Sequence, residues 1–326
     1  MPRWPDAHVT DSAIFLYQTR EDADAGVNIG GSGFLVGLRW DDPRASPLAF
    51  HIYAVSNYHV VKAKKPATVV RLNTHDGKSK SIETGVDEWF HRDGWDVAIC
   101  RLDAAEHFRA DTPYEYRFPV FTEVNLETET ARKYNLGIGD EVFSVGRFVD
   151  LHGLQRNVPL VRSGIIAATG EVRIRTGPSI PWEYEQAWIV EMRSRTGFSG
   201  SPVYVYIDQL FSRLVDTEIE VSQALFHGPW ILGVQSSQFP GSDPAYDQGS
   251  GMATVVPCRA LADLLLRDDR VLAERAEYEA RWISAPKAVE SVAPSTTADN
   301  PSHREDFNSL LTAAVKGQKS APKTSR

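Results

Sequence analysis

The stretch Gly197-Phe198-Ser199-Gly200-Ser201-Pro202, followed by the apolar run Val203-Tyr204-Val205-Tyr206, is the most direct indication of fold and chemistry in this chain. A serine between two glycines, just ahead of a proline and a strand-like run, is typical of a nucleophile presented at the mouth of a β-barrel. Gly197 permits a sharp turn, so that its own N–H and that of Ser199 can point at one spot. A carbonyl oxygen that becomes an oxyanion there would find a preorganised site. We therefore predict Ser199 as a nucleophile, with the amides of Gly197 and Ser199 as its oxyanion hole.

Two upstream segments supply a base and an orienting carboxylate. His59 comes just after an alternating apolar run, and Asp96 directly precedes the apolar run that begins at Val97. Asp93 competes for the same role, but it does not abut the strand. Taken singly, Ser199 could be a turn serine and His59 a surface histidine. The chain order His, Asp, Ser is that of the chymotrypsin type and differs from the orders in subtilisin and the α/β-hydrolases. We predict a catalytic triad of His59, Asp96 and Ser199.

At these residues the chain resembles the trypsin-like serine peptidases, and within them the bacterial Deg proteases and glutamyl endopeptidases. The resemblance spans roughly residues 10 to 260, and its further anchors are Gly31–Val36, Asn57–Val61, Trp230–Ser237 and Gly251–Pro257. It implies a bacterial enzyme of chymotrypsin-like fold that hydrolyses protein or peptide substrates without a metal or organic cofactor. The segment after the second barrel is too short for a PDZ domain, so we expect none.

The remaining pattern is rich in short, often alternating apolar segments separated by turn signals, which is typical of closed barrels. The predicted strands are 13–18, 33–39, 48–55, 67–72, 97–102, 141–145, 160–168, 187–192, 202–206, 230–235 and 253–256. We therefore predict an all-β fold of two six-stranded antiparallel β-barrels. Residues 10–135 would form the N-terminal barrel with a crossover, and residues 136–258 the C-terminal barrel.

The sequence changes character after Pro257. Residues 259–283 have helical periodicity, and by resemblance we expect this helix to pack on the second barrel. Residues 284–326 are predicted to be a flexible linker and a short amphipathic helix, whose apolar face carries Phe307, Leu310, Leu311 and Val315. Three hypotheses for this helix are possible: it binds a protein partner, it folds back onto the peptidase, or it is a weakly ordered tail.

The specificity pocket is less well defined by the sequence. Arg193 lies six residues before Ser199, where trypsin-type enzymes that prefer basic side chains carry an acidic group. A cation there would favour Asp or Glu at the cleavage site; the alternative is that Arg193 turns to solvent or pairs with Glu191. By resemblance, Ser236, Ser237 and Gln238 would line the opposite wall.

Composition narrows the class of protein. The chain has 326 residues, a net charge of −8 and two cysteines, Cys100 and Cys258. The charge argues against nucleic acid as a partner, and no run is long and apolar enough to cross a bilayer. Few cysteines and the lack of a signal-like start predict a cytoplasmic location.

Three functions remain open at this point. The first is an active serine endopeptidase, and the second a latent or partner-activated module of the same fold. The third, an esterase, is disfavoured because Gly-Phe-Ser-Gly-Ser lacks the second glycine of the nucleophile elbow.

Overall fold

The computed structural model describes most of the chain up to residue 284. The described residues are 7–45, 49–62, 64–74, 76–102, 117–126, 128–146, 156–174, 183–192, 197–208, 226–238 and 251–284. The chain divides into two units, Met1–Ile283 and Ser284–Arg326. The predicted linker and amphipathic helix, with Phe307, Leu310, Leu311 and Val315, lie outside the described residues, as does Arg193.

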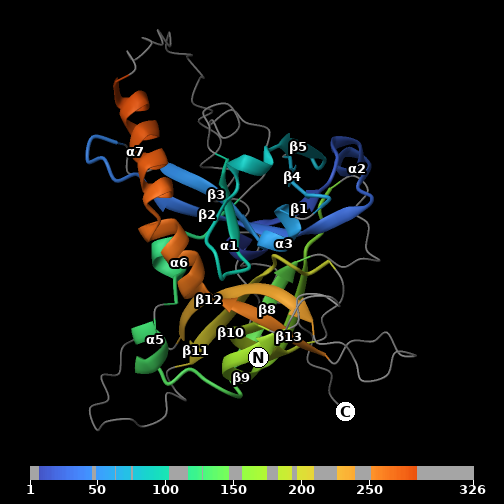
Figure 1. Cartoon of the computed structure of the whole chain (residues 1–326), viewed down its shortest axis with the longest axis vertical. Helices are drawn as coiled ribbons and strands as arrows, with labels where there is room; N and C mark the ends of the chain where they lie inside the picture. Colours follow the sequence, from blue (N-terminus) through green and yellow to red (C-terminus); the bar gives the residue numbers. More distant parts are fainter. Residues whose placement is uncertain are drawn as a thin grey trace, which may run out of the picture. The chain divides into compact units, whose positions relative to one another are not determined.

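The first half of the chain forms an antiparallel sheet of seven strands. They are β1 Ala13–Tyr17, β2 Ile29–Arg39, β3 Phe50–Ser56, β4 Val69–Asn73, β5 Ser79–Glu83, β6 Phe90–His91 and β7 Ala98–Arg101. Their order is β5-β4-β1-β2-β3-β7-β6, and in Figure 1 they are drawn in blue to cyan. All five residues of β1 are buried, which suits a strand paired on both sides. The six-stranded closed barrel predicted for this half is not confirmed, since the described strands number seven with β5 and β6 at the edges.

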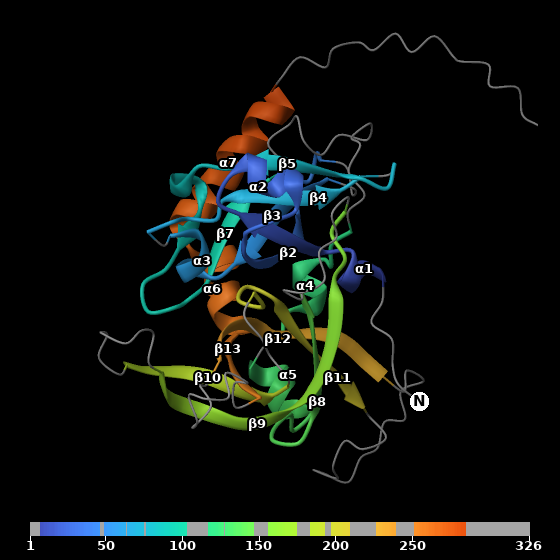
Figure 2. The ribbon, with the colours of Figure 1, turned by 90° about the vertical axis from the view of Figure 1, so that its right-hand side faces the viewer.

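The second half forms a closed barrel of six antiparallel strands, as predicted. They are β8 Glu141–Gly146, β9 Leu160–Ile174, β10 Glu183–Glu191, β11 Pro202–Asp208, β12 Phe226–Gln238 and β13 Met252–Pro257. The closed order is β10-β13-β12-β11-β8-β9. Strand β11 carries the run that follows the serine motif, and Val203, Tyr204 and Val205 are fully buried. Figures 1 and 2 both show this barrel below the first sheet.

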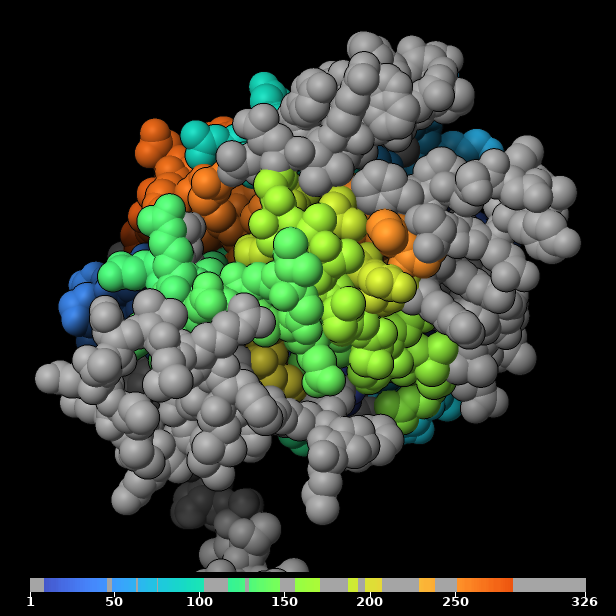
Figure 3. Space-filling view, turned by 90° about the horizontal axis from the view of Figure 1, so that it is seen from below, coloured from blue at the N-terminus to red at the C-terminus, as the bar shows by residue number. Residues whose placement is uncertain are grey.

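Short helices connect the strands and close their ends. They are α1 Ala7–Thr10, α2 Arg20–Ala25, α3 Tyr58–Val61, the 3-10 turn Val86–Glu88, α4 Phe121–Val124 and α5 Thr128–Lys133. The described part of the crossover links both halves through isolated parallel bridges, because Val120 pairs with Gly37 of β2 and Asn125 with Ile231 of β12. Seen from below in Figure 3, the green crossover residues lie directly against the yellow-green barrel strands.

Two helices, rather than the single predicted helix 259–283, follow the barrel. Helix α6 spans Cys258–Arg267 and α7 spans Asp269–Ser284. They separate at Asp268, whose backbone is extended and whose carboxylate accepts a hydrogen bond from Arg270 N at 3.0 Å. Asp268 therefore acts as an N-cap that starts a new helix. The prediction of one helix was wrong because it rested on apolar periodicity alone, whereas the Asp268 cap starts a second helix.

The two helices differ in what they pack against. Helix α6 contacts β12 and β13, as expected for a helix that closes the second barrel, and it also contacts β7 of the first sheet. Helix α7 instead lies beside β2 and β3 of the first sheet (Figure 1). There Glu279 meets the buried His51 of β3, with 2.8 Å between Glu279 Oε1 and His51 Nε2. The expectation of packing on the second barrel therefore holds for α6 only.

Candidate active site

The histidine sits on the short helix α3, directly after strand β3. Asn57, the N-cap residue that precedes α3, is fully buried, and its side chain donates from Nδ2 to Asp96 O at 2.7 Å. The His59 side chain is about half exposed (49%), so it faces solvent at the edge of the sheet. Strand β3 pairs with β7, which brings the residue before β7 next to the residue after β3. The sheet register thus places His59 beside Asp96.

Asp96 holds His59 at two points. Asp96 Oδ2 lies 2.7 Å from His59 Nδ1, and Asp96 Oδ1 accepts the backbone N–H of His59 at 2.9 Å. Burial of Asp96 acts to raise its pKa. The hydrogen bonds and charge of His59, together with the Ser236 hydroxyl, outweigh burial and leave the pKa below its ordinary value. The carboxylate is therefore ionised at neutral pH and fixes the orientation of the imidazole.

Ser236, on strand β12 of the barrel, connects the aspartate to the nucleophile. Its hydroxyl donates to Asp96 Oδ2, and its backbone carbonyl accepts the Ser199 hydroxyl at 3.0 Å. We predicted Ser236 as part of a pocket wall from resemblance, but its side chain is directed at the carboxylate. A single residue of the second half therefore contacts Asp96 of the first half and Ser199.

The loop that carries Ser199 is held in a conformation that only glycine adopts readily. Gly197 and Gly200 have φ values of 98° and 89°, in the left-handed region. A Cβ on Gly200 would overlap Ser32 O and Ser56 Oγ of the first sheet. Between the glycines, Phe198 is fully buried, with the Arg162 guanidinium 4.2 Å from the centre of its ring. Both halves of the molecule therefore shape this loop.

The predicted site residues come together without a complete hydrogen-bonded triad. The Ser199 hydroxyl donates to Ser236 O, and the described residues contain no hydrogen bond between Ser199 Oγ and His59 Nε2. The amides of Gly197 and Ser199 donate to no backbone acceptor within the described part of the chain. These two N–H groups are the ones predicted to bind an oxyanion.

Of the other residues predicted to line the specificity pocket, the structure describes the side chain of Ser237. Ser237 N donates to Thr254 Oγ1 at 3.0 Å, and the two hydroxyl oxygens are 2.6 Å apart. The Ser237 hydroxyl is thus engaged with strand β13. Arg193 and the side chain of Gln238 lie outside the described residues.

Sequence reasoning missed two further contributors, Asn57 and Ser32. Asn57 precedes the histidine by two residues, so its position beside the predicted base was a usable signal. The hydroxyl of Ser32 donates to Gly197 O at 2.7 Å, across the boundary between the halves. No short-range sequence signal links residues so far apart in the chain.

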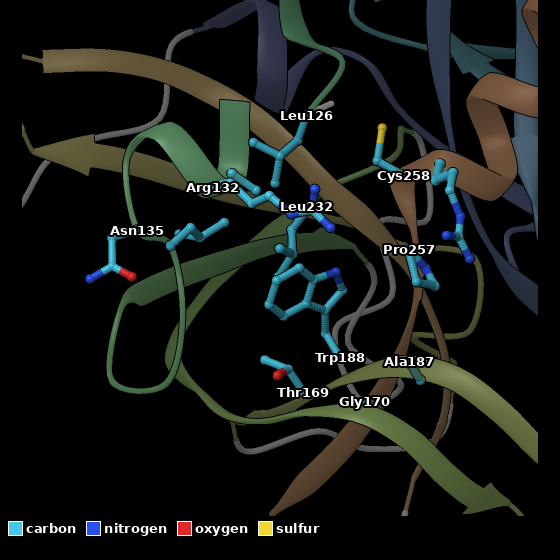
Figure 4. Close-up of a pocket in the computed structure, with 13 residues that line it drawn as sticks. Leu126, Arg132, Asn135, Thr169, Gly170, Ala187, Trp188, Leu232, Pro257 and Cys258 are labelled. Carbon is cyan, nitrogen blue, oxygen red and sulfur yellow. The ribbon is translucent and has the colours of Figure 1, made fainter. Parts of the chain in front are cut away.

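A hollow of about 440 Å³ lies on the second half, apart from these residues. Figure 4 shows the indole of Trp188 within it, between Leu232 and Thr169. One of its lining residues, Arg259, has its guanidinium 5.6 Å from the ring centre of Trp95, the residue before Asp96. None of the predicted site residues lines this hollow.

Within the described ranges, no group of three or more His, Cys, Asp or Glu side chains is arranged to hold a metal ion. None of the helices that the structure describes has the length and apolar character needed to span a membrane.

Comparison with known families identifies the class of protein. A family model for the trypsin-like peptidase domain matches residues 31–208, and this chain belongs to that family. The matched segment contains His59, Asp96 and Ser199. Membership implies that the substrates are proteins or peptides. No curated protein sequence matches the chain.

Several solved structures resemble the fold at low sequence identity. The inactive form of the Rv3671c protease is 15% identical, with a TM-score of 0.42, and the match covers 79% of this chain and 89% of that one. The active form of the same protease, from M. tuberculosis, is also 15% identical, with a TM-score of 0.43, and covers 79% and 81% of the two chains.

Proposed function

We propose that this protein is a serine endopeptidase that forms an acyl-enzyme on Ser199, with His59 as general base and Asp96 orienting it. One observation carries the proposal: Ser236 bonds both the Asp96 carboxylate, which holds His59, and the Ser199 hydroxyl. This arrangement supports a nucleophile, a base and an orienting group at one place.

The mechanism begins with a change of hydrogen-bond acceptor. Ser199 Oγ turns from Ser236 O to His59 Nε2, which accepts the hydroxyl proton as the oxygen attacks the substrate carbonyl. The His59 Nδ1–H stays on Asp96, which selects the tautomer with a free Nε2 and stabilises the imidazolium. His59 then gives the proton to the leaving amine. Water repeats the sequence and releases the acyl group from Ser199.

The negative charge that forms on the substrate oxygen needs donors. The amides of Gly197 and Ser199 would supply them, which fits their lack of backbone acceptors in the described chain. Fixed donors in such a site lower the barrier, since they require no rearrangement as charge develops.

We also propose a domain organisation. The chain would divide into residues 10–135, 136–258, 259–283 and 284–326, and the N-terminal sheet would close into a barrel.

The proposal extends to specificity, location and partners. Arg193 would give the substrate pocket a preference for acidic side chains, with Ser237 and Gln238 nearby. The enzyme would be bacterial, cytoplasmic and without a cofactor, and Phe307 to Val315 would bind a partner.

A second candidate function is a latent or partner-activated peptidase. The observation that favours it is the Ser199 hydroxyl, which bonds Ser236 O rather than His59. In that case a partner or substrate would have to shift the hydroxyl before any attack.

A fluorophosphonate probe tests the proposal, because it reacts with a serine only where base and oxyanion donors are assembled. Purified wild type would be compared with Ser199→Ala and His59→Ala. We expect labelling of wild type and a loss of roughly 10³-fold or more in both variants. Folded wild type that stays unlabelled would contradict an active enzyme and support the latent candidate. Wild-type enzyme that has not been exposed to the probe is then tested on ester and peptide substrates, and cleavage of esters alone would contradict the endopeptidase.

A further inference from the structure

Ser32 joins the strand that leads to the histidine with the loop that carries the nucleophile. It lies on β2 and is fully buried. Its hydroxyl donates to Gly197 O at 2.7 Å, and its backbone N–H donates to Ser199 O at 2.9 Å. Its own carbonyl accepts the hydroxyl of Ser56 at 2.8 Å, three residues before His59. One residue of the first half thus anchors two carbonyls of the loop in the second half.

These two bonds act on alternate peptide groups of the loop. The predicted oxyanion donors, Gly197 N and Ser199 N, belong to the peptide groups on either side of the Gly197 carbonyl group. Gly197 has no side chain to limit its rotation, and its φ of 98° lies where glycine moves freely. The orientation of the Gly197 carbonyl is therefore set by its hydrogen bond. Ser199 N shares its peptide group with Phe198 O, which accepts Ser201 N at 2.9 Å, and the anchors at Gly197 O and Ser199 O hold the peptide groups on either side.

We propose that the Ser32 hydroxyl is a positioning group for the oxyanion hole, which it holds in the reactive conformation through Gly197 O. The proposal rests on the function proposed above. It assigns a chemical role to the serine of the Gly31-Ser32-Gly33 motif, whereas the sequence pattern indicated only a strand.

The local packing separates this role from that of the Ser32 backbone. Replacing Ser32 by alanine removes the bond to Gly197 O and leaves the N–H to Ser199 O in place. The close approach of Gly200 to Ser32 O is also unchanged. The loop would therefore stay docked while the Gly197 carbonyl loses its restraint.

The experiment compares acylation in wild type, Ser32→Ala, Ser32→Thr and Ser12→Ala. Ser12 is a matched control, since its buried hydroxyl donates to Val9 O at 2.8 Å. We expect Ser32→Ala to lower kcat and the fluorophosphonate labelling rate roughly tenfold with KM unchanged, less than the loss of an oxyanion donor itself. Ser32→Thr, which keeps the hydroxyl, should recover most of the rate. Ser12→Ala should lose stability without a change in kcat.

Other outcomes would overturn the inference. Equal kcat in Ser32→Ala and wild type would do so, as would a lower melting temperature with an unchanged labelling rate. Crystal structures of wild type and Ser32→Ala decide the geometry independently of activity: a Gly197 carbonyl that keeps its orientation without the hydroxyl would also contradict it. Unlabelled wild type would count against the proposed function, and the pair of crystal structures would still decide the role of Ser32.

Discussion

The carboxylate of Glu279 on α7 lies 2.8 Å from the buried imidazole of His51 on β3, so the last described helix is fixed to the first sheet. The same carboxylate accepts the backbone N–H groups of Asp41 at 3.1 Å and Asp42 at 3.0 Å. His51 also stacks on Trp40, with 5.4 Å between the ring centres. A single side chain of α7 therefore satisfies three polar groups of the other half.

Replacing Glu279 by alanine should destabilise the protein by about 3 kcal/mol, because it removes the carboxylate that the buried His51 imidazole and two backbone amides contact. Urea unfolding at neutral pH measures this loss. Glu277→Ala is the matched control, since it lies on the same helix but forms an exposed pair with Arg281. Both changes alter helix propensity equally, so equal stabilities for the two variants would contradict the anchoring role.

Gly200→Ala should abolish labelling and fold poorly, because the new Cβ would overlap Ser32 O and Ser56 Oγ. Gly251→Ala offers a control with a similar φ of 78° and, among the described residues, no atom within 4 Å of the added carbon. That variant should lose only about 1 kcal/mol, from the left-handed backbone alone. Melting temperatures and probe labelling of the pair isolate the steric contribution. Wild-type labelling of Gly200→Ala would show that the loop is not confined as described.

Asp96 should make stability depend on pH in acid. Its pKa lies below the ordinary value of 3.8 in the folded state. The ionised carboxylate therefore contributes its full stability above that value, and the contribution is lost as the pH falls through the folded pKa. The difference in unfolding free energy between wild type and Asp96→Asn should be constant near neutrality and shrink below pH 3.8. A difference in unfolding free energy that grows as the pH falls would contradict this prediction.

Ser236→Ala should raise the pKa of Asp96, since the variant removes one of the groups that lower it. An NMR titration of the carboxylate reports this directly. Ser237→Ala should leave that titration at its wild-type position, because the Ser237 hydroxyl contacts Thr254. An unchanged Asp96 titration in Ser236→Ala would show that the Ser236 hydroxyl does not lower the pKa of Asp96.

The two cysteines should be unreactive in the native protein. Both are free and buried, and burial raises the pKa of Cys258 to about 12 and that of Cys100 as well. A thiol reagent at pH 8 should therefore detect neither until denaturant is added. Rapid reaction of a thiol before unfolding would show that one of these sites opens to solvent.

Arg193 provides a test of specificity. With a cation in the pocket, peptides with Asp or Glu at the cleavage site should be cleaved in preference to those with Lys or Arg. Arg193→Ala should reduce that preference, whereas Arg132→Ala, on the crossover helix α5, should not. A preference of the wild type for Lys or Arg would exclude the acidic pocket.

Most of the strands followed from local pattern. All the predicted strands overlap observed strands, because buried β-branched and aromatic runs with turn signals at their ends are a strong local signal. Strand β5 was missed since Ser79–Glu83 is polar except for Ile82 and pairs with β4 alone. An edge strand of this kind takes its structure from its neighbour.

The site was predictable to the extent that its residues lie in short motifs. His59 and Asp96 were placed beside one another from their positions after and before apolar runs, and the structure has that contact. The orientation of the Ser236 hydroxyl and the reach of Ser32 depend on how two distant segments meet, which no local spacing encodes. The course of α7 likewise depends on buried polar contacts, such as those of Glu279 with His51 and of Arg275 with Leu265 O, which its apolar periodicity does not encode.

The bond between His51 and Glu279 has a consequence for the order of events during biosynthesis. The two residues are 228 positions apart, so a ribosome needs on the order of 10 to 50 s to make the second after the first. Through that interval the emerging first half has its imidazole without the carboxylate that will cover it. The N-terminal sheet, including strands β3 and β7 beside His59 and Asp96, therefore gains its last buried contact only after the barrel strands have left the ribosome. A nascent peptidase built this way reaches its most stable form late, because the bond between His51 and Glu279 can form only after both barrel and helix have been synthesised.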